Sequence, residues 1–88
     1  MGAELMSIPK EINDAFFTGN RSEKIKYVIN DTVIITDGEY KGKEAAVISV
    51  ESIEPNVSFL LETFDGTGDI IVPQSFINLL IPSEVGKK

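Results

Sequence analysis

The side chains of this chain that could do acid–base chemistry are carboxylates. Five of them lie between residues 51 and 69: Glu51, Glu54, Glu62, Asp65 and Asp69. General acid–base catalysis near neutral pH needs a carboxyl group whose pKa is raised by burial, whereas carboxylates in turns and at strand edges are usually solvated. The chain has no histidine and no cysteine, so it lacks the commonest proton shuttle and the thiolate nucleophile. We therefore expect no catalytic residue, no bound metal and no cofactor.

One glycine-containing segment could be read as a calcium loop, a nucleotide-binding loop or a hairpin. Residues 65–69, Asp-Gly-Thr-Gly-Asp, contain oxygen ligands but lack the spacing and the final glutamate of an EF-hand calcium loop. No helix follows Gly66 and Gly68, so this is not a nucleotide-binding loop either. The segment is typical of a tight hairpin, in which the glycines supply positive φ.

The charge of the chain is uneven. Its 88 residues carry a net charge of −6, and residues 1–30 are balanced. Residues 31–81 hold nine carboxylates and only two lysines, a net charge of −7. Since affinity for nucleic acids depends largely on basic side chains that neutralise phosphates, this segment should repel a phosphate backbone.

The length predicts one domain. No apolar run is long enough for a membrane span, and the first ten residues lack the pattern of a signal peptide. We expect a cytoplasmic protein without a membrane partner; its oligomeric state is left open.

Residues 7–19 are predicted to form a short helix. Ser7 can cap it, Pro9 suits its first turn, and Gly19 with Asn20 can end it. One face of this helix is apolar and consists of Ile8, Ile12, Ala15 and Phe16. This face either covers one end of the following domain, which we favour, or binds a partner.

Five short strands are predicted after a polar connector at 20–26. They span residues 26–36 (interrupted at 30–31), 45–51, 57–64, 69–72 and 76–81, with one turn of 3₁₀ helix at 73–75. Such short, evenly spaced strands favour a small closed barrel. Alternation predicts a core that contains Val33, Ile35, Val47, Leu61, Val72 and Leu79.

The segment 31–50 contains a strand, a loop with Gly38 and Gly42-Lys43, and a second strand rich in valine. This pattern resembles the KOW motif of small SH3-like β-barrels. The resemblance covers residues 27–81. It implies a mostly β fold, a five-stranded SH3-like, KOW-type barrel, with the short N-terminal α-helix added to it. The chain would then divide into a helix and connector (1–26), a barrel (27–81) and a polar C-terminal tail (82–88).

The resemblance also implies a non-catalytic binding module. Its binding loop would follow the first barrel strand and consist of Gly38, Glu39, Tyr40, Lys41, Gly42 and Lys43. A further possible partner surface consists of Phe16, Phe17, Arg21, Lys24 and Lys26. Members of the family that this segment resembles include ribosomal large-subunit proteins and transcription elongation factors. Similar barrels also serve as small accessory subunits of photosynthetic and redox complexes, where they contact protein.

Three functional hypotheses follow from these observations. Because Glu39 and Glu44 flank the two loop lysines, we favour a protein-binding accessory subunit. An RNA-binding protein associated with the ribosome or with transcription is the alternative. A small carboxylate-dependent hydrolase is the weaker alternative.

Overall fold

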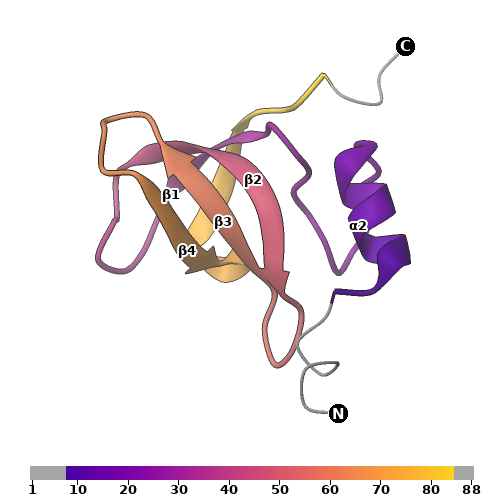
Figure 1. Cartoon of the computed structure of the whole chain (residues 1–88). Coiled ribbons are helices and arrows are strands. Elements are labelled where there is room, and N and C mark those ends of the chain that lie inside the picture. Colours follow the sequence, from indigo (N-terminus) through magenta and orange to yellow (C-terminus); the bar gives the residue numbers. More distant parts are fainter. Residues whose placement is uncertain (1–7, 85–88) are drawn as a thin grey trace.

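The computed structural model describes residues 8–84 and shows a mostly β chain with one short helix (Figure 1). The elements follow in the order α2 (Lys10–Phe17), β1 (Thr32–Ile35), β2 (Glu44–Ser52), β3 (Ser58–Thr63), β4 (Asp69–Pro73), the 3₁₀ turn η1 (Gln74–Phe76) and β5 (Ile77–Ile81). The predicted helix, five strands and 3₁₀ turn are therefore confirmed.

The first strand begins six residues later than the prediction of residue 26, at Thr32. Asn30 has a φ of 70°, which a strand cannot contain, and the amide of Asp31 donates to the Val28 carbonyl at 3.1 Å. This turn separates residues 26–29 from the sheet.

All strand pairs are antiparallel, and the strand order is β4-β3-β2-β1-β5. Irregularities between Val47 and Ser49 and between Val50 and Ser52 bend β2, which is the long curved strand of Figure 1. No ladder joins β4 to β5 within residues 8–84, so the predicted closed barrel is wrong in this respect. After β4, the η1 turn takes the chain to the opposite edge of the sheet, where β5 pairs with β1.

The core lies on the inner face of this sheet. Five of the six predicted core residues are buried there: Val33, Ile35, Val47, Leu61 and Val72. The sixth prediction is wrong, because Leu79 is 41% exposed. Leu79 lies opposite Val33 in the ladder and so shares its face, but β5 is an edge strand whose other side has no paired neighbour among the described residues.

The helix α2 packs on the core, as the favoured interpretation of its apolar face predicts. Phe16 is fully buried and stacks on Phe59 with ring centroids 6.1 Å apart, while Ile8 and Ile12 pack partly buried against the same cluster. The amides of Gly19 (φ 84°) and Asn20 donate back to Phe16 and Ala15, which ends the helix in a Schellman motif. The predicted cap Ser7 lies outside the described residues.

A buried carboxylate ties the connector and the C-terminal segment to the sheet. Arg21 donates from both Nη atoms to Asp31, which also accepts from the amides of Val28 and Ser83. Ser83, in the predicted polar tail, is only 5% exposed. The connector and the start of the predicted tail therefore both contact the sheet through this carboxylate.

No helix between residues 8 and 84 has the length and apolar character needed to cross a membrane.

Candidate functional site

The loop between β1 and β2 is shaped by two glycines. Gly38 and Gly42 have φ angles of 83° and 94°, a region that favours glycine because it has no Cβ. The Lys41 amide donates to the Gly38 carbonyl at 3.2 Å, and the Gly42 amide returns to Ile35 at 2.7 Å. These two bonds fold the loop back onto the end of β1.

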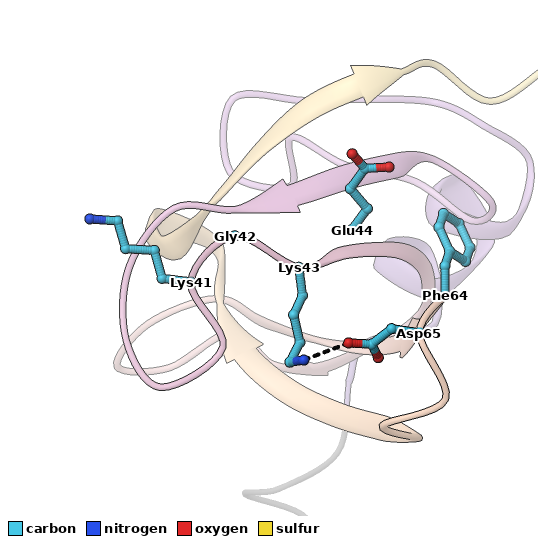
Figure 2. A pocket seen from close by; sticks show the side chains of 6 residues that line it. All are labelled: Lys41, Gly42, Lys43, Glu44, Phe64 and Asp65. Atoms are coloured by element: carbon cyan, nitrogen blue, oxygen red, sulfur yellow. Dashed lines mark hydrogen bonds and ion pairs between the residues drawn. The ribbon is translucent and has the colours of Figure 1, made fainter.

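A shallow, open hollow of about 520 Å³ lies between the end of this loop and the β3–β4 turn. It is lined by Lys41, Gly42, Lys43, Glu44, Phe64 and Asp65 (Figure 2). The two segments meet because the Phe64 amide donates to the Glu44 carbonyl at 3.1 Å, which extends the β2–β3 ladder by one pair. The sheet register therefore places the hollow at one end of the β2–β3 pair.

An ion pair crosses the hollow. Lys43 Nζ lies 2.5 Å from Asp65 Oδ2, and the amide and hydroxyl of Thr67 donate to Oδ1 of the same carboxylate. The hydrogen bond from Lys43, and then those from Thr67, lower the pKa of Asp65 well below its ordinary value. Asp65 therefore stays ionised at neutral pH, which makes it unsuitable as a general acid, and it neutralises the charge of Lys43.

The remaining lining side chains differ in their surroundings. Figure 2 shows Lys43 pointing toward Asp65, whereas Lys41 projects away from the pair and Glu44 and Phe64 point to the other side of the strands. The Phe64 side chain is 58% exposed, although it is large and apolar. The lining of the hollow thus holds a neutralised ion pair on one side of the strands, an exposed aromatic ring on the other, and one lysine, Lys41, without an ion pair among the described residues.

The structure brings together only part of the predicted binding loop. Lys41, Gly42 and Lys43 line the hollow, while Gly38 and Glu39 do not. Tyr40 is partly buried against the hydrophobic core, so its ring is not a free contact surface.

The predicted partner surface around α2 and the connector needs correction. Phe16 is fully buried and cannot contact a partner, whereas Phe17 is 48% exposed. Arg21 is bound to Asp31, and Lys24 lies 3.5 Å from Glu54. Lys26 is exposed, and its amide donates to Gln74. These cations therefore do not form one unpaired basic patch.

Sequence reasoning placed Glu44 beside the loop lysines but missed Phe64 and Asp65 as neighbours of the loop. The inward residues of β3 alternate along the strand: Phe59, Leu61 and Thr63. Phe64 comes directly after Thr63, so the alternation places its side chain on the outward face. The contact with the loop depends on strand register, which no local pattern specifies.

The five carboxylates considered for catalysis do not converge on one enclosed site. Asp65 and Glu54 are in ion pairs, and Glu51 accepts a hydrogen bond from Ser49 at 3.0 Å. Glu62 and Asp69 lie directly opposite each other, and all five residues are exposed. Within residues 8–84, no group of three or more acidic side chains could hold a metal ion. Comparison with protein families, curated proteins and solved structures gave no match.

Proposed function

We propose that this chain is a non-catalytic, protein-binding accessory module, and that the hollow is part of its contact surface. The observation that carries this proposal is that the lining of the hollow contains an exposed aromatic residue, Phe64, and a neutralised ion pair, Lys43–Asp65, on opposite sides of the strands. Protein interfaces are enriched in aromatic side chains at their centres and depleted in unpaired charge. A phosphate-binding surface would need cations that are free to neutralise phosphates, and Lys43 is already neutralised.

We further propose that the fold is SH3-like and of the KOW type. Three features support this: the antiparallel order β4-β3-β2-β1-β5, the loop with positive φ at Gly38 and Gly42, and the η1 turn before β5. The fold by itself would not define the partner, since one fold hosts many functions. The nature of the partner therefore has to come from the surface chemistry.

RNA binding is the second candidate, and one observation favours it. Lys41 is exposed at the rim of the hollow and is in no ion pair among residues 8–84. A single free lysine supplies only one phosphate contact, whereas tight binding usually needs several. This candidate therefore ranks below protein binding.

Site-specific cross-linking in the native cells tests both candidates. Benzoylphenylalanine replaces Lys41 at the hollow in one full-length variant, and Asn56, an exposed residue in the β2–β3 hairpin, in a matched control. We expect position 41 to give a discrete adduct that protease removes and ribonuclease leaves intact, and that weakens when Phe64→Ser is added. If ribonuclease removes the adduct instead, the result supports RNA binding as the function of this surface. The same adduct from position 56, or none from position 41, would reject the hollow as the contact surface.

A further inference from the structure

The outer face of the sheet carries a second unusual surface, on β2, β3 and β4. Glu62 of β3 lies directly opposite Asp69 of β4, and one step along the same face Leu60 lies opposite Ile71. At the end of β2, Glu44 is joined to Phe64 by a backbone hydrogen bond. We call this surface the acidic face and define it by Glu44, Glu62, Phe64, Asp69 and Ile71.

The acidic face holds like charges at close range. Directly opposite residues in an antiparallel pair have Cβ atoms about 4.5–5.5 Å apart, and like charges in such pairs are destabilising. Glu44, Glu62 and Asp69 are all exposed, and none of them is in an ion pair within residues 8–84. The nearest lysine along the chain, Lys43, is bound to Asp65 instead. Within the described part of the chain, these three carboxylates therefore have no cation paired to them.

Large apolar side chains lie beside these carboxylates. Phe64 and Ile71 are 58% and 57% exposed, and Leu60 is partly buried between its neighbours on the face. A solvated strand face would ordinarily carry polar residues at such positions. The face therefore offers two kinds of contact: carboxylates that are in no ion pair among residues 8–84, and exposed apolar side chains.

We propose that the acidic face docks a basic amphipathic helix of a protein partner. This inference rests on the proposed protein-binding function and specifies the chemistry of the partner. Glu62 and Asp69 lie one strand spacing apart, about 4.8 Å. Lysine or arginine side chains three or four residues apart on a helix have Cβ atoms about 5–6 Å apart, which matches this spacing. Apolar side chains on the same helix would cover Ile71 and Phe64.

Other occupants fit the face less well. A nucleic acid would bring phosphates against three carboxylates, which repel them. A second copy of the chain, with a net charge of −6, would bring more negative than positive charge. A basic helix complements both the charge and the apolar part of the face.

The test is an NMR titration of the ¹⁵N-labelled full chain with a designed Lys/Leu helical peptide of about four turns. We expect shift changes at the amides of the acidic face. A peptide with serine in place of leucine should bind at least about tenfold more weakly, because it cannot cover Ile71 and Phe64. Shift changes spread over the whole surface, or no binding, would overturn the proposal.

Two double variants distinguish the effect of the carboxylates on the acidic face from the effect of the net charge of the chain. Glu62→Lys/Asp69→Lys and Glu11→Lys/Glu23→Lys both change the net charge from −6 to −2, but only the first alters the face. We expect the first to weaken peptide binding at least about tenfold and the second about twofold or less. Equal loss in both variants would contradict the proposal.

A dilution series of the chain without peptide tests whether a second copy of the chain occupies the acidic face. Concentration-dependent shifts at the acidic face would show that the chain itself is the occupant and would reject a basic helix. If the peptide experiments fail while position 41 still cross-links to protein, this inference falls and the proposed function stands. If position 41 gives no protein adduct, the hollow is rejected as the contact surface.

Discussion

Asp31 is the residue with the most consequential polar contacts in the described chain. Its side chain is fully buried and accepts four hydrogen bonds, two from the guanidinium of Arg21 at 2.5 and 2.8 Å and one each from the amides of Val28 and Ser83. Bidentate, charge-assisted bonds of this kind are among the strongest in proteins. They tie the connector at Arg21, and Ser83, which lies 52 residues after Asp31, to the start of β1.

The first prediction is that Asp31→Ala lowers the free energy of unfolding by about 3 kcal/mol. Removing one partner of a buried ion pair leaves the other groups unsatisfied, and the partial exposure of Arg21 favours the lower end of the usual 3–5 kcal/mol range. Asp14→Ala is the matched control, because its pair with Lys10 is exposed and contributes little. Urea unfolding monitors both variants, and equal losses of stability would contradict the role given to Asp31.

The second prediction concerns pH. Burial alone would raise the pKa of Asp31, but the hydrogen bonds from Arg21, Val28 and Ser83 outweigh it and lower the pKa below its ordinary value. The lowered pKa of Asp31 stabilises the folded state at pH values above the pKa of an aspartate in the unfolded chain, about 3.9. This stabilisation is lost as the pH falls through the pKa that Asp31 has in the folded state. We expect the unfolding free energy of the wild type to fall more steeply below about pH 5 than that of Asp31→Asn. Parallel curves in urea titrations would disprove this linkage.

Among the elements, the docking of α2 depends on one of two adjacent phenylalanines. Phe16→Ala should lower the free energy of unfolding by about 3–5 kcal/mol, because it empties a fully buried site against Phe59. Phe17→Ala should cost about 1 kcal/mol or less, since this ring is 48% exposed and meets Phe16 only edge-on. Thermal and urea unfolding compare the two; similar losses would mean that the helix does not pack as described.

The loop between β1 and β2 supplies the next prediction at this scale. Alanine at either Gly38 or Gly42 should cost about 1–2 kcal/mol for the positive φ. Gly38→Ala should cost about 1 kcal/mol more, because its Cβ would lie 2.8 Å from Cε2 of Phe76, whereas Gly42 has open space. A double-mutant cycle with Phe76→Leu should recover this excess at Gly38 and not at Gly42. A coupling energy of zero between Gly38→Ala and Phe76→Leu would show that the Phe76 ring moves aside without loss of stability.

At the scale of the whole molecule, the charge distribution predicts no tight nucleic-acid binding. Residues 31–81 have a net charge of −7, and Arg21, Lys24 and Lys43 are already in ion pairs. We expect dissociation constants weaker than micromolar for labelled RNA at about 150 mM salt. Titration at several salt concentrations checks this. Tighter binding with a steep salt slope, abolished by Lys41→Glu/Lys43→Glu, would contradict the prediction.

Local patterns in the sequence determined the secondary structure and much of the core. The helix with its glycine end, the five strands, the η1 turn and five buried residues follow from periodicity and from the backbone freedom of glycine, which act within a few residues. Half of the hollow was predictable in the same way, because Lys41, Gly42 and Lys43 belong to the glycine-bounded loop.

Only the tertiary structure decided which segments meet. The contact of Lys43 with Asp65 spans 22 residues, and that of Asp31 with Ser83 spans 52. Glu62 faces Asp69 because of the register between β3 and β4. Leu79 is exposed because β5 lies at the edge of an open sheet, although its alternation predicts burial. Strand register and sheet edges arise from pairing between distant segments, and so the surfaces proposed for binding could not be derived from the order of residues alone.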